Sequence, residues 1–503
     1  MVNTNKAILR VVLVLSYIVL IGLVVFGISA LFSYLNTGAD RSNMLHTEVK
    51  KIDQYLPDIE WSELNNLGRE ISQTTLNELE NDYLDAWYVK HVAFMTNIET
   101  GIDDYYTESA RENIFNIIAL NKADSISIEG TTLSHQPTLE FYSEDGQLAV
   151  ITDRNVLEFK RIYEADKMVL ETREVSTYKV LMLLEDGFWR IRHMVKEEVA
   201  PYKDEIDTVK LSGEIKGINY YPQGSPWDLF GDYFDESVIS DDFKLIKASG
   251  LNSVRVFIPY EDFGKANVKK EKLNKLKLLL DLALIHDLKV ILTLFDFYGD
   301  YSVLDWTLNR EHARTIVSEF KDHEAIMAWD LKNEPNLDFD SRGRENVMAW
   351  LETMIDLVKS VDEIHPVTIG WSNAGSAPLL KENVDFVSFH YYDDIDKIGE
   401  TYTNLKTSIE KPVAITEFGL SSYRGLWNPF GHSETTQAEY HKRAQEQFKN
   451  LEIPYMSWTL YDFEDIPREV VGRLPWRKNA QKQFGFINVD GGKKESFNYI
   501  SKD

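Results

Sequence analysis

The chain of 503 residues contains no cysteine. This absence excludes disulfide bonds, thiolate nucleophiles and thiolate metal sites. It does not indicate a reducing compartment, because a chain of this length can bury stable cores without covalent cross-links. The length also exceeds what one hydrophobic core usually organises, so two or more domains are expected.

Positive charge is also scarce. The chain has 54 Lys and Arg residues against 81 Asp and Glu residues, which gives a formal net charge of −27. Nucleic acids and other polyanions bind to basic patches, so this balance argues against such partners. Solubility alone explains an acidic surface, and a neutral polysaccharide remains compatible with it.

Charge is missing altogether between Val11 and Leu35, where the residues are mostly apolar. This run exceeds the roughly 20 residues that span a bilayer core. Lys6 and Arg10 precede it and Asp40 is the first charge after it, which predicts a cytoplasmic N-terminus. A cleaved signal peptide is the alternative, but the run is long for one and no Ala-x-Ala site follows. We therefore expect a transmembrane signal anchor within residues 1–40, with the lipid bilayer contacting residues 11–35 and the rest lying outside the cytoplasm.

Two segments of different character follow the predicted anchor. Residues 41–75 are polar and predict a stalk with some helix. Residues 76–204 begin with apolar residues at helical spacing and continue as strand-like runs, with a turn signal at Glu185-Asp186-Gly187. Helices followed by hairpins predict a small α+β domain, and the pattern resembles the nuclear-transport-factor-2-like (NTF2-like) fold. We expect a spacer, or a docking module for another envelope protein.

In residues 205–503 the sequence pattern predicts strands that alternate with helices. The candidate strands are 214–220, 253–258, 289–295, 325–331, 366–370, 384–391, 412–417 and 454–461, and the clearest helices are 240–249, 272–286, 345–360 and 435–450. This count and length predict a (β/α)8 TIM barrel. A doubly wound open sheet is the alternative, but it would normally carry a glycine-rich phosphate loop that Gly217-Ile218-Asn219-Tyr220 does not supply.

Two glutamates stand where predicted strands end. Glu334 lies in Asn333-Glu334-Pro335. Glu417 is the last residue of the predicted apolar strand 412–417 and is followed by Phe418-Gly419. Catalytic groups of TIM barrels lie at these strand ends. Two neighbouring carboxylates are the equipment for cleaving a glycosidic bond, because burial and mutual repulsion let one be protonated while the other is ionised.

These motifs resemble those of clan A glycoside hydrolases, and within that clan the cellulase family (glycoside hydrolase family 5). Arg255, in Ser-Val-Arg-Val-Phe, is similar to the family's strand-two arginine. His390 and Tyr392, in Phe-His-Tyr-Tyr, are similar to its His-x-Tyr pair after strand six. Trp458, in Met-Ser-Trp-Thr-Leu, is similar to the strand-eight tryptophan under the cleaved sugar. The resemblance covers residues 211–500.

The resemblance implies a role for each of these residues. Glu334 would be the general acid/base and Glu417 the nucleophile of a retaining double displacement. Arg255 and Tyr392 would hold Glu417 by hydrogen bonds, and His390 would orient the acid or the sugar. Two further substrate contacts are expected, from the amide of Asn333 to the sugar 2-hydroxyl and from the ring of Trp458.

One departure from the family concerns strand three, where a histidine is usual. This chain reads Leu294-Phe295-Asp296-Phe297, so Asp296 either occupies the same space or marks a site for another sugar. Aromatic residues near strand ends predict a cleft on which pyranose rings stack, and core packing is the alternative for each of them. They are Trp227, Tyr298, Tyr301, Trp306, Trp371, Trp427 and Trp476.

The sequence as a whole predicts a membrane-anchored, extracytoplasmic, retaining endo-β-glycanase that hydrolyses a β-glucan or β-mannan. No metal or organic cofactor is expected. A transglycosylase or an exo-β-glycosidase with the same carboxylates is the nearest alternative. A non-catalytic carbohydrate-binding or scaffold protein of an exopolysaccharide system is another.

Overall fold

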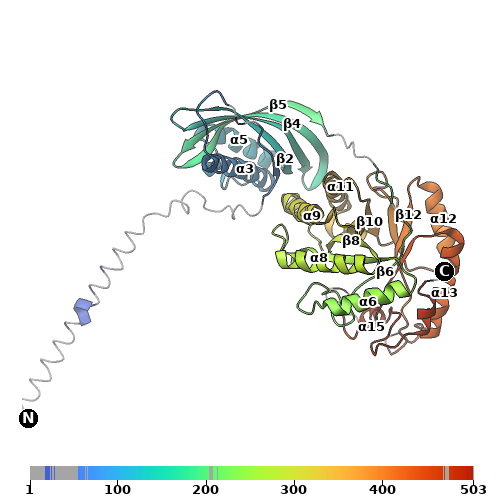
Figure 1. Ribbon diagram of the computed structural model, residues 1–503. Coiled ribbons are helices and arrows are strands. Elements are labelled where there is room, and N and C mark those ends of the chain that lie inside the picture. Colours follow the sequence, from blue (N-terminus) through green and yellow to red (C-terminus); the bar gives the residue numbers. More distant parts are fainter. Residues whose placement is uncertain are drawn as a thin grey trace, which may run out of the picture. The chain divides into compact units, whose positions relative to one another are not determined.

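The computed structural model describes residues 55–501 except 63, 65, 203–207, 212, 427, 468, 469 and 471–474, together with a few isolated positions between 17 and 28. The chain divides into two compact units, Met1–Ala200 and Pro201–Asp503 (Figure 1). This division lies close to the boundary expected between residues 204 and 205.

The expected transmembrane segment, residues 11–35, lies almost wholly outside the described residues. In the part of the chain that is described, no helix combines the length and the apolar character that crossing a bilayer requires. The anchor therefore stays a prediction.

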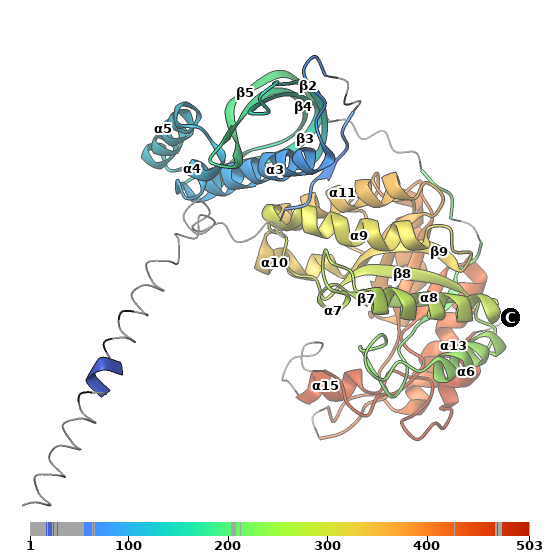
Figure 2. The same ribbon diagram turned by 60° about the vertical axis from the view of Figure 1, so that its left-hand side comes forward.

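The first unit packs helices against a strongly curved, mostly antiparallel sheet. Its strands follow the order β1-β2-β3-β4-β5, and α3 lies across the concave face of the sheet (Figure 2). Buried aromatic and aliphatic side chains from both layers, among them Trp87 and Trp189, form one core. The elements are α3 (Gln73–Thr96), α4 (Ile102–Tyr105), α5 (Glu108–Asp124), β1 (Asp58–Ile59), β2 (Ile126–Tyr142), β3 (Leu148–Glu164), β4 (Lys167–Glu185) and β5 (Phe188–Pro201). The expected order of helices before hairpins is present, and the NTF2-like resemblance stays a prediction.

The part of the predicted stalk that the structure describes, from Tyr55 onward, belongs to this unit. Tyr55 is buried and its hydroxyl hydrogen-bonds Thr132. The short strand β1 pairs in parallel with β2 at Ser134 and His135. The described residues between 55 and 72 are therefore part of the domain rather than a stalk. Their polar composition hid this, because a short edge strand is held mainly by backbone hydrogen bonds and needs few apolar side chains.

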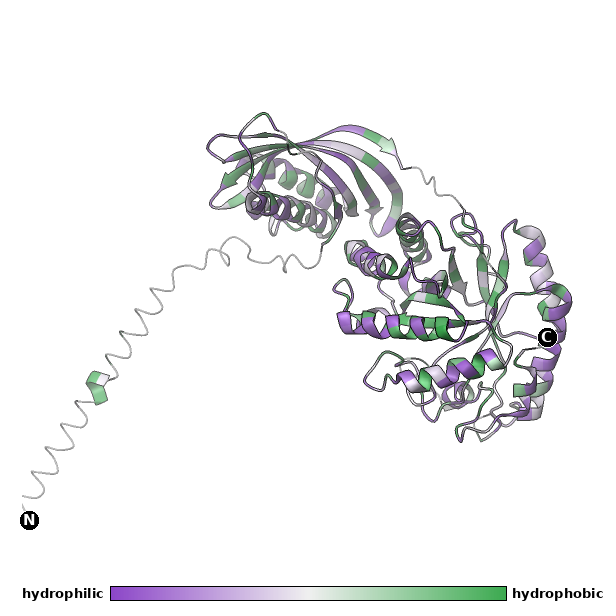
Figure 3. Ribbon diagram, viewed as in Figure 1, coloured by the Kyte–Doolittle hydropathy of each residue, from purple (hydrophilic) through white to green (hydrophobic). Residues whose placement is uncertain are grey.

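The second unit is a closed barrel of eight parallel strands in the order β10-β11-β12-β13-β6-β7-β8-β9. The predicted TIM barrel is thus confirmed. Its strands are β6 (Lys216–Asn219), β7 (Ser253–Pro259), β8 (Lys289–Asp296), β9 (Ile326–Asn333), β10 (Val367–Trp371), β11 (Val387–Tyr391), β12 (Val413–Phe418) and β13 (Tyr455–Ser457). These strands are almost continuously buried, as expected where helices cover a parallel sheet. The covering helices are amphipathic: along helices such as α8, apolar and polar residues alternate, so that one face is apolar and the other polar (Figure 3).

Helices connect most of these strands and cover the barrel. The helices are α6 (Glu236–Ala248), α7 (Tyr260–Phe263), α8 (Lys270–Ile285), α9 (Trp306–Phe320), α10 (Phe339–Arg342), α11 (Arg344–Val361), α12 (Ile398–Ser408), α13 (Glu434–Leu451) and α15 (Pro475–Gln481), with short 3-10 turns at Val303–Asp305, Pro335–Asp338, Ile395–Lys397 and Glu495–Tyr499. The four helices expected from periodicity correspond to α6, α8, α11 and α13. At the N-terminal end of the strands, a small apolar cluster that includes Ile291, Met327 and Met456 fills the barrel. The opposite end is left for polar side chains.

A buried ion pair fixes the connection between α11 and two strands. Asp385, which is 1 % exposed, accepts a hydrogen bond from Lys359 Nζ at 2.8 Å. It also accepts the backbone N–H groups of Val367 at 2.8 Å and Val209 at 2.9 Å. Loss of one member of such a pair leaves the other charge buried without compensation.

We predict that Asp385→Ala lowers the free energy of unfolding of the barrel by about 3–5 kcal/mol, because Lys359 is left as an unpaired buried cation. Urea unfolding monitored on the barrel transition measures this loss. Glu439→Ala is the matched control, since Glu439 pairs with Lys442 on the exposed face of α13, and no measurable change is expected. Equal effects of the two substitutions would contradict the importance of the buried pair.

Candidate active site

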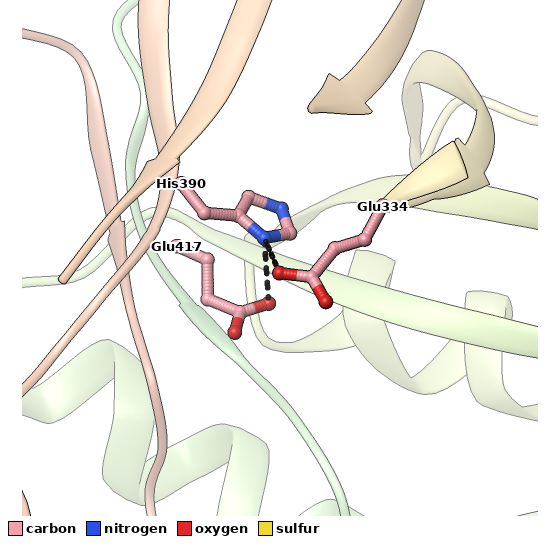
Figure 4. A group of neighbouring side chains, drawn as sticks. All are labelled: Glu334, His390 and Glu417. Atoms are coloured by element: carbon pink, nitrogen blue, oxygen red, sulfur yellow. Dashed lines mark hydrogen bonds and ion pairs between the residues drawn. The ribbon is translucent and has the colours of Figure 1, made fainter. Parts of the chain in front are cut away.

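The two predicted glutamates lie together at the C-terminal end of the barrel. Glu334 directly follows β9, and Glu417 lies one residue before the end of β12. His390 of β11 stands opposite Glu417 in the strand register. Figure 4 shows the three side chains pointing toward one another, with the imidazole beside both carboxylates.

The distances make this a close group. His390 Nδ1 lies 2.8 Å from Glu334 Oε1 and 3.7 Å from Glu417 Oε2. One oxygen of each glutamate and a ring nitrogen of His390 all lie within 4.8 Å of one another. Two carboxylates at this separation repel each other unless they share a proton or find cationic partners.

Arg255 supplies the cation. Its side chain is fully buried in β7, and Nη1 lies 3.3 Å from Glu417 Oε2. Nη1 also donates to Asn219 Oδ1 at 3.1 Å, and Nη2 donates to Asn333 Oδ1 at 2.9 Å. One guanidinium therefore orients the predicted nucleophile and the predicted sugar-binding amide together.

Asp330 balances this buried charge and was not among the predicted site residues. It is fully buried in β9 and accepts from Arg255 Nε at 2.9 Å, from Thr293 Oγ1 at 2.8 Å and from the Gly370 N–H at 2.9 Å. A sequence signal for it existed. An aspartate inside an apolar strand requires a partner, and Arg255 is an isolated cation inside another such strand.

Gly370 of β10 lets these groups approach one another. A Cβ atom at this position would lie 2.7 Å from Arg255 Nη2 and 3.2 Å from both Asp330 Oδ2 and His390 Nε2. These neighbours belong to the buried network and have little freedom to move away. Glycine is required here because only a hydrogen fits between the strand and the guanidinium.

The backbone of Glu334 adopts an unusual conformation. Its φ angle is +48°, in the left-handed region that costs a non-glycine residue about 1–3 kcal/mol. Its N–H donates to the Gly370 carbonyl at 2.7 Å, and Pro335 begins the short 3-10 turn that follows. The strand is thereby turned at this residue, and the carboxylate comes to line the cleft.

Tyr392 and Trp458 complete the predicted set. The hydroxyl of Tyr392 donates to Glu417 Oε1, so each oxygen of Glu417 has a hydrogen-bond donor. Trp458 follows β13 and packs beside Trp227, with ring centroids 5.7 Å apart. Both predicted residues line one cleft with the two glutamates.

This cleft has a volume of about 710 Å³. Its lining includes Trp227 and Tyr298 among the predicted aromatic residues, and adds Tyr221 and Phe257, which the sequence did not single out. Val470 and Gln481, the last residue of α15, also line the cleft.

The remaining predicted aromatic residues lie elsewhere. Tyr301, Trp306 and Trp371 are buried and are not part of the cleft lining, so core packing describes them better. Trp427 lies outside the described residues, and the side chain of Trp476 is not described.

Asp296, at the family's usual histidine position, does face the cleft. It is 5 % exposed and accepts from the Tyr221 hydroxyl at 3.3 Å. Burial raises the pKa of Asp296 to about 6, against the nearby charges of Lys332 and Arg255. A carboxyl group with this pKa can donate or accept a hydrogen bond near neutral pH.

The two central glutamates have pKa values displaced in opposite directions. Burial raises the pKa of Glu417, and the charge of Glu334 adds to this, while His390, Arg255 and Tyr392 act against it. Burial also acts to raise the pKa of Glu334, but the hydrogen bond and charge of His390, together with the charges of Arg255 and Lys332, outweigh it, so that this pKa is lowered. The surroundings of the two carboxyl groups therefore displace their pKa values in opposite directions, that of Glu417 upward and that of Glu334 downward.

The same three side chains are the group in the described residues whose donor atoms could meet at a metal ion. Their other contacts disfavour this use. Arg255 places a fixed positive charge 3.3 Å from Glu417, and Tyr392 donates to the other oxygen. A cation there would meet the repulsion of the nearby guanidinium.

Comparison with known proteins places this site in context. The profile of the family described as Cellulase (glycosyl hydrolase family 5) matches residues 214–464. Mannan endo-1,4-beta-mannosidase 5 of Solanum lycopersicum is 29% identical over 171 residues, 25% of this chain and 40% of its own length. Mannan endo-1,4-beta-mannosidase A of Emericella nidulans is 24% identical over 220 residues, 35% of this chain and 55% of its own. The chain thus spans about half, or less, of the curated relatives named here.

A relative of another kind and a solved structure are also similar. Beta-glucuronidase of Mus musculus is 23% identical over 300 residues, covering 54% of this chain and 43% of its own. The structure of an exo-beta-1,4-mannosidase from Opitutaceae bacterium strain TAV5 aligns with a TM-score of 0.48 and 17% identity, covering 57% of this chain and 58% of the other.

We predict that Glu334→Gln lowers the pKa of Glu417, because the substitution removes the negative charge that helps to raise it. Carbon-13 NMR titration of protein labelled at the glutamate carboxyl, with Glu417→Gln used to assign the signal, measures the change. Glu439→Gln, at an exposed position on α13, is the control and leaves the Glu417 titration unchanged. An unchanged or higher pKa in Glu334→Gln would refute the proposed coupling.

Proposed function

Residues 214–464 belong to the cellulase family, glycosyl hydrolase family 5, and from this premise we propose that the protein hydrolyses β-linked polysaccharide with retention of anomeric configuration. The observation that carries the proposal is that a carboxylate oxygen of Glu334 and one of Glu417 lie within 4.8 Å of each other at the mouth of the barrel. Retaining enzymes hold their carboxyl groups about 5–5.5 Å apart, whereas inverting enzymes leave room for a water at about 6.5–9.5 Å.

The proposed reaction has two displacements. Glu417 attacks the anomeric carbon while Glu334 gives its proton to the departing glycosidic oxygen, which leaves a covalent glycosyl-enzyme. Glu334 then takes a proton from water, the water oxygen bonds to the anomeric carbon, and Glu417 is released as a carboxylate. Arg255 and Tyr392, one on each oxygen of Glu417, support its role as the nucleophile and leaving group.

Glu334 must carry a proton in the first displacement, and its contact with His390 acts against this because it lowers the pKa of Glu334. His390 Nδ1 lies between the carboxylates, 2.8 Å from Glu334 and 3.7 Å from Glu417. We propose that bound sugar shifts this hydrogen bond toward Glu417. That exchange removes the interaction that lowers the pKa of Glu334 and adds one that stabilises the Glu417 carboxylate.

For the substrate we favour a β-1,4-mannan and take a β-glucan as the second candidate. Several relatives carry the name mannan endo-1,4-beta-mannosidase, and the family profile is that of the cellulases. Trp227, Tyr298 and Trp458 line the cleft and suit stacking on pyranose rings. Internal cleavage is proposed, and exo cleavage or transglycosylation with the same carboxylates remain the alternatives.

We predict that the full chain in detergent degrades β-1,4-mannan, and that Glu334→Gln and Glu417→Gln each lower kcat by at least about 10²-fold, because each removes one of the two proton- or sugar-transferring groups. Reducing-end assays and product chain lengths measure this, and mixed oligomers early in the reaction identify an endo enzyme. Glu382→Gln, an exposed surface change, is the control and retains activity.

Activated aryl glycosides with azide distinguish the roles of the two glutamates. In Glu417→Ala, azide replaces the nucleophile and gives a product of inverted configuration. In Glu334→Ala, azide attacks the glycosyl-enzyme and gives a product of retained configuration. If Glu334→Ala gave the inverted product and Glu417→Ala the retained one, Glu334 would be the nucleophile and Glu417 the acid/base. Binding of polysaccharide without cleavage by the unmutated chain would instead favour a scaffold protein.

We further propose that the apolar residues 11–35 anchor the protein in the cell membrane, with the barrel outside the cytoplasm. Residues 76–204 would then separate the barrel from the bilayer or dock it to another envelope protein.

We predict that the full chain sediments with washed membranes and is released by detergent but not by high salt, because the apolar run is held by burial of hydrocarbon rather than by charge. Cell fractionation with immunoblotting measures this. A chain that lacks residues 1–40, directed outside by a cleavable signal, serves as the control and stays in the soluble fraction. Release of the intact protein by washing alone would argue against the anchor.

A further inference from the structure

A second cavity lies within the N-terminal unit, between its helices and the curved sheet. Its volume is about 500 Å³, within the range of small-molecule sites, about 300–1,000 Å³. Much of its wall is apolar and comes from helices and strands, including Phe94 of α3, Ile114 and Ile117 of α5, and Ile162 of β3. None of these residues belongs to the barrel, so this cavity is separate from the glutamate cleft.

Cationic side chains share this lining with the apolar residues. Lys90, Lys160 and Arg192 all line the cavity, although the chain as a whole is strongly acidic. The cavity lining is thus rich in cationic side chains, and the nearby buried carboxylate of Glu158 already forms an ion pair with Lys160.

Lys90 has weaker partners. Its half-buried ammonium group lies 3.6 Å from Met194 Sδ and 4.4 Å from the ring centroid of Trp87. Within the described part of the chain, no carboxylate lies within ion-pair distance of it. Burial lowers the pKa of Lys90 to about 8, so the side chain is still mainly charged at neutral pH. A thioether and an aromatic face compensate a buried ammonium less well than a carboxylate does.

His91 adds a polar atom without a partner. The residue is 4 % exposed, and its Nε2 has no hydrogen-bond partner among the described residues. Burial lowers the pKa of His91, so the ring is neutral and one of its nitrogens carries a hydrogen. Buried polar atoms are nearly always hydrogen-bonded in folded proteins, so this one is available to a ligand.

From these features we propose that the N-terminal cavity binds an amphipathic anion, a molecule with an acyl-like apolar body and a carboxylate or phosphate head. The apolar body lies against Phe94, Ile114 and Ile117. The head accepts hydrogen bonds from Lys90 and, in the tautomer with hydrogen on Nε2, from His91. This binding is independent of the proposed hydrolase activity.

Isothermal titration calorimetry of the full chain tests the proposal with three probes of equal chain length: decanoate, decyl phosphate and decanol. We predict saturable binding of at least one anion, and at least about tenfold weaker binding of decanol, because the alcohol lacks the charge-assisted hydrogen bond to Lys90. The tighter of the two anions identifies the head group. Absence of binding by both anions, or equal binding of the alcohol, would overturn the proposal.

Matched variants locate the site. Lys90→Met keeps the length of the side chain but removes its charge, and weakens anion binding by at least about tenfold. Lys122→Met, on an exposed turn of α5 outside the cavity, leaves the affinity unchanged. Ile117→Trp fills the apolar part and abolishes binding, while Ile98→Trp, at an exposed position outside the lining, does not. Circular dichroism confirms folding, and unchanged affinity in both Lys90→Met and Ile117→Trp would refute this location.

Discussion

The site depends on one buried guanidinium. Arg255 lies inside the barrel with no exposure and meets Asp330 and Asn333 of β9, Asn219 of β6 and Glu417 of β12. Asp330 compensates its charge, so the pair can remain in the interior. Because the contacts come from different strands, closure of the barrel and orientation of the site are coupled. The same coupling explains Gly370, whose missing side chain leaves the space that the guanidinium occupies.

Much of the barrel and its central residues could be predicted because local signals agreed. Apolar runs, separated by helical periods, placed the strands, and Glu334 and Glu417 stood where two of them end. Parallel strands bring such ends together whatever the details of register. Asp330 and Gly370 could not be assigned in the same way. Their roles depend on which side chains face each other inside the closed barrel, and a shift of one residue reverses the direction in which a strand side chain points.

Aromatic residues and the first domain show where sequence patterns are insufficient. A ring near a strand end packs equally well into the core or beside a cleft, since both are apolar surfaces. Trp227 and Tyr298 line the cleft, whereas Trp306 and Trp371 are buried away from it. The segment around Tyr55 was assigned to a stalk because its composition is polar. Backbone pairing of β1 with β2, which composition does not report, makes it part of the domain.

The two glutamates have different surroundings, and this difference is a property of the chain rather than of the substrate. Glu417 accepts a hydrogen bond on each oxygen and is the more buried of the two. Glu334 contacts His390, and its backbone has a left-handed conformation. Burial raises the pKa of Glu417, whereas contact with the imidazole helps to lower the pKa of Glu334. Since His390 Nδ1 lies near both carboxylates, a modest displacement of its ring changes which of them is stabilised as the anion. In the proposed mechanism, a bound sugar that contacts Glu334 changes these interactions, and His390 positions the proton rather than reacting itself.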